Sequence, residues 1–153
     1  RQYGNTFSLI RSARKILSLG PKALVVKKGE YGAVLFANGG ELNDSFFFVP
    51  AYPLEKIQDP TGAGDSFAGG FIGYLASRGS TEMADLRRAM VHGSVVASYT
   101  VEDFGLGRLR ALTREQVQQR YLDFKRFTNF EPTCPWSDSC SHLASVEGGL
   151  EGH

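Results

Sequence analysis

The stretch that constrains this chain most is a glycine-rich turn leading directly into an apolar helix, DPTGAGDSFAGGFIGYLA at residues 59–76. Glycines without a Cβ let backbone N–H groups converge on one point, and the positive end of a helix dipole adds to them. Such a turn suits an anion, most often a phosphate group. Asp65 stands where the helix starts. It could be a simple N-terminal cap, or a base that accepts a proton from a hydroxyl group attacking a bound phosphate.

The spacing of the glycines argues against better-known motifs. A dinucleotide-binding fingerprint would need glycine where Phe67 stands, and a P-loop would need lysine where Asp65 stands. A hydrolase elbow would need glycine in place of Ala68. The segment GDSF does look like the nucleophile block of GDSL hydrolases, with Ser66 as the nucleophile. The downstream Asp-x-x-His that this class pairs with its serine is absent from the sequence, however.

Hydrophobic periodicity predicts short strands followed by helices. The β-branched or aromatic runs that predict strands are residues 23–28, 33–36 and 45–50. The segments with helical spacing of apolar residues are 7–19, 67–75, 82–100 and 113–129, the last with a Thr-x-x-Gln capping box. Gly69, Gly70 and Gly73 would each cost a free helix about 1 kcal/mol, so we expect them to permit close packing against a sheet. This order of elements indicates an α/β layer fold.

The composition excludes several classes of protein. With 153 residues and a net charge of +1, the chain has the length of one domain and no charge excess that would hold it on nucleic acid or an anionic membrane. No apolar run approaches the roughly 18 residues of a membrane span, and the first residues lack a signal-peptide pattern. Cys134 and Cys140 are too few for a disulfide framework. We therefore expect a cytoplasmic protein that binds neither nucleic acid nor membranes.

Three blocks of sequence are more specific than composition: DPTGAGDSFAGGFI at 59–72, VVKKGEYGAVLF at 25–36 and AMVHGSVVASYTVEDFG at 89–105. The first resembles, position by position, the C-terminal signature of the ribokinase/PfkB carbohydrate kinase family. The second is similar to that family's strand–turn–strand with K-x-G-x-x-G, and the third to the helix and loop after the signature. The resemblance implies an α/β, ribokinase-like (Rossmann-like) three-layer sandwich, of which residues 1–131 would be the C-terminal portion. Residues 132–153 are left as an irregular tail, whose last residues could be left over from cloning.

The resemblance implies a role for each residue of the glycine turn. The amides of Gly62, Ala63 and Gly64 would form an anion hole that stabilises charge on the transferred phosphoryl group. Asp65 would be the base for the substrate hydroxyl group. The residues that would help to place a monovalent cation, typically potassium, are Asp59 and Thr61. The implied activity is phosphoryl transfer from ATP with Mg²⁺ to a hydroxymethyl group of a sugar or nucleoside.

The resemblance also implies where the nucleotide would lie. Lys27, Gly29 and Gly32 would border ATP, and the two glycines would let it approach the backbone closely. Lys27 could attract phosphate, although a lysine that ends a strand is more often solvated. Ser94 and the histidine and glycine before it match the family's helix near the adenine only loosely, so plain helix packing is an equal alternative.

Parts of the family pattern are missing from this chain. Family members are about twice as long, with their sugar-binding residues and lid in an N-terminal half, and the Asn-x-x-Glu motif that positions magnesium is absent here. We therefore expect the chain to need that N-terminal half, to form a homodimer or to aggregate. The alternative to a kinase is a catalytically incomplete nucleotide-binding fragment or interaction module. Which sugar or nucleoside would be the acceptor stays open.

Overall fold

Three consecutive strands form one antiparallel sheet in the order β1–β2–β3. The structure is a computed structural model that describes residues 8–38, 45–105 and 107–129. The strands are β1 (Ala23–Lys27), β2 (Ala33–Ala37) and β3 (Phe46–Val49). A 3₁₀ turn, η1 (Gly29–Tyr31), joins the first two, so that Lys27 pairs with Ala33 and Ala23 with Ala37. The strand–turn–strand that the resemblance implies is therefore present, and it is an antiparallel hairpin.

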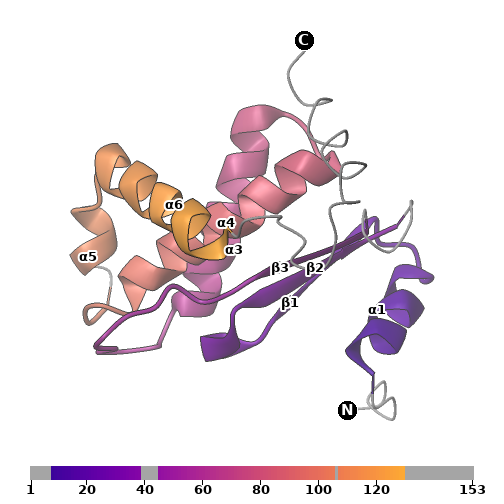
Figure 1. The fold of residues 1–153 in the computed structure, drawn as a ribbon, viewed down its shortest axis with the longest axis horizontal. Coiled ribbons are helices and arrows are strands. Elements are labelled where there is room, and N and C mark those ends of the chain that lie inside the picture. Colours follow the sequence, from indigo (N-terminus) through magenta and orange to yellow (C-terminus); the bar gives the residue numbers. More distant parts are fainter. Residues whose placement is uncertain (1–7, 39–44, 106, 130–153) are drawn as a thin grey trace, which may run out of the picture.

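The central strand β2 is buried on both faces, and this produces three layers. Val34 and Phe36 pack with Ala13 and Leu17 of helix α1 (Leu9–Leu17) on one face. Leu35, with Ala33, belongs to the larger core on the opposite face. Figure 1 shows α1 on one side of the sheet and the other helices on the far side. The chain thus has the α/β three-layer arrangement that the sequence predicted.

Helix α4 (Met83–Thr100) is the centre of the larger core, because it contacts the sheet and three other helices. Met90 and Val95 on this helix are completely buried. Helices α3 (Ala63–Arg78) and α6 (Arg114–Thr128) pack on α4, and the short α5 (Gly107–Arg110) lies between α4 and α6 in the chain. The beginning of α6 has the predicted capping box, since the Thr113 hydroxyl accepts the amide of Gln116 at 3.3 Å and the Gln116 side chain accepts the amide of Thr113 at 3.1 Å.

The prediction for the glycines of α3 was wrong in two respects. Only Gly70 makes a close contact, and its partner is a helix: a Cβ there would lie 3.1 Å from the Cα of Gly93 on α4. At Gly69 and Gly73, no atom of the described residues lies within 4 Å of a Cβ position. The reason is that α4, not α3, covers the sheet, so one face of α3 stays exposed.

The remaining sequence predictions concern the membrane and the tail. Within the described ranges, no helix is long and apolar enough to cross a bilayer. The predicted tail at 132–153, with its two cysteines, lies outside the described residues.

Candidate active site

The glycine turn has the conformation that its sequence requires. Gly62 precedes α3 with φ 80° and ψ −6°, a left-handed conformation that favours glycine. One Asp59 carboxylate oxygen accepts the amide of Thr61 at 2.9 Å and so closes a local turn. Hydrogen bonds from Thr61 hold the pKa of the Asp59 carboxyl group below its usual value. The carboxylate therefore stays charged beside the turn at neutral pH.

The first amides of α3 are only partly used by the turn. The Ala63 amide donates to the carbonyl oxygen of Pro60 at 3.2 Å, and the Asp65 amide donates to that of Gly62 at 3.1 Å. Among the described residues, the amides of Gly62 and Gly64 have no acceptor. Two of the three amides predicted for the anion hole are thus available to a ligand, and the Asp65 side chain beside them is exposed.

A lysine from the sheet reaches the same turn. The Lys27 ammonium group, at the end of β1, donates to the carbonyl oxygen of Gly64 at 2.9 Å. A Cβ on residue 64 would lie 2.7 Å from that nitrogen, so a side chain there would require the end of Lys27 to shift. The contact places a positive charge at the first turn of α3. Lys27 is still an exposed residue, so it is open to solvent and at the same time bonded to the turn.

A cavity of about 540 Å³ opens between the glycine turn, η1 and α4. It contains six of the residues predicted for the site: Lys27, Gly29, Gly32, Ala63, Gly64 and Ser94. Its apolar lining includes Leu54, Ile57, Phe67, Ala97 and Val101. Gly62, Asp65, Asp59 and Thr61 are not part of this lining, so the turn contributes to the cavity only through its inner residues. The cavity therefore joins a polar end, which carries Lys27 and Glu30, to an apolar region.

Gly32 is required by the fold at the edge of this cavity. Its φ is 88°, and a Cβ there would overlap the carbonyl oxygen of Val49. Any side chain would push β3 away from the hairpin. Packing alone thus requires glycine at this position, and the approach of a nucleotide to it stays a prediction.

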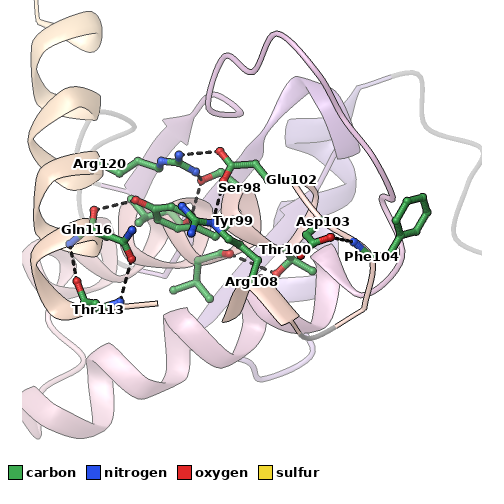
Figure 2. Close-up of polar contacts among 12 residues, drawn as sticks. Ser98, Tyr99, Thr100, Glu102, Asp103, Phe104, Arg108, Thr113, Gln116 and Arg120 are labelled. Carbon is green, nitrogen blue, oxygen red and sulfur yellow. Dashed lines mark hydrogen bonds and ion pairs between the residues drawn. The ribbon is translucent and has the colours of Figure 1, made fainter. Parts of the chain in front are cut away.

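Sequence reasoning missed a cluster around Arg120 on α6. The guanidinium group lies between two aromatic rings, 3.5 Å from the centroid of Tyr99 and 4.5 Å from that of Tyr52. It donates to Glu102 at 2.7 Å and to the Ser98 hydroxyl at 3.0 Å, as Figure 2 shows for the two acceptors. Tyr52 and Ser98 line the cavity, so Arg120 supports it from outside.

No local pattern marks this cluster, since its members come from distant parts of the chain. Burial, and then the charge of Asp123, raises the pKa of the Tyr52 hydroxyl group. Tyr52 donates to that carboxylate at 3.3 Å. The phenol group therefore stays neutral and directs its hydrogen away from the cavity, toward α6.

The three loosely matched residues of α4 separate in the structure. His92 stacks between Tyr74 and Tyr121, with ring centroids at 4.5 and 4.7 Å, and it does not line the cavity. Burial lowers the pKa of its imidazole. Gly93 packs against Phe67, whose carbonyl oxygen would lie 2.8 Å from a Cβ. Helix packing thus accounts for these two, and only Ser94 lines the cavity.

The chain is similar to known kinases along most of its length. A family described as pfkB family carbohydrate kinase matches residues 5–111. A nucleoside kinase from Methanothermobacter thermautotrophicus is 35% identical over 118 residues, which are 74% of this chain and 32% of that protein. A 2-dehydro-3-deoxygluconokinase from Thermoproteus tenax is 39% identical over 84 residues, which are 52% of this chain and 24% of that protein.

A solved structure agrees with these matches. The nucleoside kinase of Methanocaldococcus jannaschii, an archaeal member of the ribokinase family, superposes with a TM-score of 0.56 and 27% identity. The match covers 76% of this chain and 34% of that one. The chain therefore spans between about a quarter and a third of the length of the proteins it matches.

Proposed function

The chain belongs to the pfkB family of carbohydrate kinases, and on that basis we propose that it carries the ATP site and the anion hole of a kinase that phosphorylates a hydroxymethyl group of a sugar or nucleoside. The observation that carries this proposal is that Lys27, which bonds to the turn, and Gly64, whose amide is free, both line a cavity of about 540 Å³. Phosphoryl transfer depends mainly on positioning and on stabilising charge, and these groups can do both.

The residues present fit a nucleoside triphosphate. Backbone amides and one lysine offer donors to phosphate oxygens, while the apolar lining offers a dry surface to a purine ring. The chain's own part in the reaction would be to hold the γ-phosphate against the turn. Asp65, exposed beside the free amides, would accept the proton of the acceptor hydroxyl group.

Few protein side chains would be available to bind a metal ion. Among the described residues there is no cluster of three or more histidine, cysteine, aspartate or glutamate side chains that could hold a metal. Mg²⁺ commonly binds through phosphates, waters and one or two carboxylates, so it would be brought with ATP. Asp59 keeps free lone pairs after accepting the Thr61 amide, so it and the Thr61 hydroxyl remain our proposed ligands for a potassium ion.

The second candidate is a nucleotide-binding module without turnover of its own. It is favoured by one observation, that the chain spans only 32% of the nucleoside kinase relative. An N-terminal half would be the partner that completes the acceptor site. Titration calorimetry with ATP, followed by a turnover screen over sugars and nucleosides with and without an added N-terminal half, separates the two candidates.

Replacing Asp65 by asparagine tests the catalytic role directly. Loss of a general base costs about 10²–10⁴-fold in turnover, whereas ATP should bind to Asp65→Asn nearly as tightly as before, because the side chain does not line the cavity. Asp103→Asn is the matched control, since it changes an exposed carboxylate that is not part of the turn. Turnover of Asp65→Asn within tenfold of the parent would remove Asp65 from this role.

A further inference from the structure

Two serines on α4 line the cavity one helical turn apart, and neither has a hydrogen to offer a ligand. The Ser94 hydroxyl donates to the carbonyl oxygen of Pro50 at 3.2 Å. The Ser98 hydroxyl donates to the carbonyl oxygen of Val95 at 2.7 Å. Both side chains are more than nine-tenths buried. A hydroxyl group has one hydrogen and two lone pairs, so what each serine can present to the cavity is a lone pair.

Arg120 fixes this arrangement at Ser98. Its guanidinium group donates to the Ser98 oxygen at 3.0 Å, and this oxygen cannot at the same time turn its own hydrogen toward Arg120. The hydrogen is therefore held on the Val95 carbonyl oxygen, and one lone pair remains. The guanidinium group cannot move freely, since it is stacked on Tyr99 and paired with Glu102 (Figure 2).

The other polar side chains of this region do not supply the hydrogen-bond donor that the two serines lack. The Tyr52 hydroxyl donates to Asp123 outside the cavity, and the Lys27 ammonium group lies at the glycine turn. The lining beside the serines is apolar, with Ala97 and Val101 on the same helix end. Among the side chains that line this part of the cavity, a polar ligand atom therefore meets the two serine oxygens as acceptors and no donor.

We infer that Ser94 and Ser98 form an acceptor-only surface, here called the hydroxyl wall, that selects a nucleotide whose base donates from an exocyclic amino group. The inference rests on the proposed function, because it assumes that the phosphates lie at the glycine turn and the base in the apolar region. A buried acceptor without a donor loses binding energy, so a base that lacks the amino group binds more weakly. Ser94 and Ser98 are specificity-determining residues, and Arg120 is a positioning residue that acts through Ser98.

The test compares ATP with purine riboside 5′-triphosphate, which differs only by the missing amino group, in titration calorimetry on the chain and its variants. The parent should bind ATP roughly fivefold more tightly, the effect of one neutral hydrogen bond. Ser94→Ala and Ser98→Ala should bring this ratio toward one, chiefly by weakening ATP. Ser77→Ala is the matched control, because its hydroxyl also donates to a carbonyl oxygen three residues earlier but lies exposed on α3.

The outcomes separate this inference from the proposed function. If both nucleotides bind the parent equally, or if both serine variants keep the parent ratio, the hydroxyl wall does not select the base, while the nucleotide site stands. If neither nucleotide binds the folded parent, the proposed function fails and the inference fails with it. Because the ratio compares two ligands on one protein, partial loss of folded protein in a variant does not change it.

Discussion

Replacing Gly93 by alanine should destabilise the fold, whereas the same replacement at Gly73 should stabilise it. Both glycines lie inside helices, so alanine gains about 1 kcal/mol of helix propensity at either position. At Gly73 nothing lies within 4 Å of the new Cβ, and the gain is kept. At Gly93 the Cβ would lie 2.8 Å from the Phe67 carbonyl oxygen and 3.2 Å from two atoms of its ring.

The clash at Gly93 has a backbone atom as its partner, so a change of rotamer cannot remove it. Overpacking of this kind costs about 1–3 kcal/mol, which leaves a net loss of roughly 0–2 kcal/mol after the propensity gain. The two variants should therefore differ by roughly 1–3 kcal/mol. For a chain of this length that corresponds to a difference in Tm of roughly 2–12 °C.

Thermal unfolding followed by circular dichroism measures this difference, with the parent as reference. Helical content before melting should be the same in both variants. A Gly93→Ala protein that melts at or above the temperature of Gly73→Ala would refute the close contact between α3 and α4, and with it the position of the glycine turn relative to α4.

Arg120→Met should lower the free energy of unfolding by about 1–3 kcal/mol, because it removes hydrogen bonds to a charged group and leaves Glu102 poorly paired. Arg126→Met, at a side chain 75% exposed, should change it by less than about 1 kcal/mol in the same urea titration; equal effects would contradict the structure. Burial lowers the pKa of the His92 imidazole in the folded protein below 6.5. At a pH between the folded pKa and 6.5, the unfolded chain therefore binds more protons than the folded chain. The free energy of unfolding should fall as the pH drops from 7 to 5. His92→Phe keeps a ring next to Tyr74 and should remove this fall, which urea titrations across that pH range would detect; a variant with the same pH dependence as the parent would show that another group is responsible.

Features set by neighbouring residues could be predicted from the sequence. The capping box at Thr113, the hairpin between β1 and β2 and the left-handed turn at Gly62 each depend on a few adjacent residues, and each is present in the structure. The partner of Gly70 could not be predicted, because a glycine in a helix indicates a close approach without saying from which element. It was assigned to the sheet, whereas α4 makes the contact.

In the candidate site too, the residues in short sequence motifs could be predicted and those brought together from distant parts of the chain could not. Lys27 and the inner glycines of the turn could be identified because they lie in short motifs, and the structure brings them to one cavity. Arg120 could not, since its contacts with Tyr52 and Ser98 join a loop, α4 and α6. The family resemblance connected His92 with the nucleotide site together with Ser94, which lies two residues later on the same helix. Successive residues of a helix point about 100° apart, so neighbours in sequence do not share a surface.

The hydrogen bond between Lys27 and the Gly64 carbonyl oxygen makes two positions 37 residues apart depend on each other. A side chain at position 64 would displace the ammonium group, and a shorter residue at position 27 would leave that carbonyl oxygen without its donor. Substitutions at the two positions should therefore be non-additive. Where related sequences tolerate a larger residue at one of them, a compensating change at the other is to be expected.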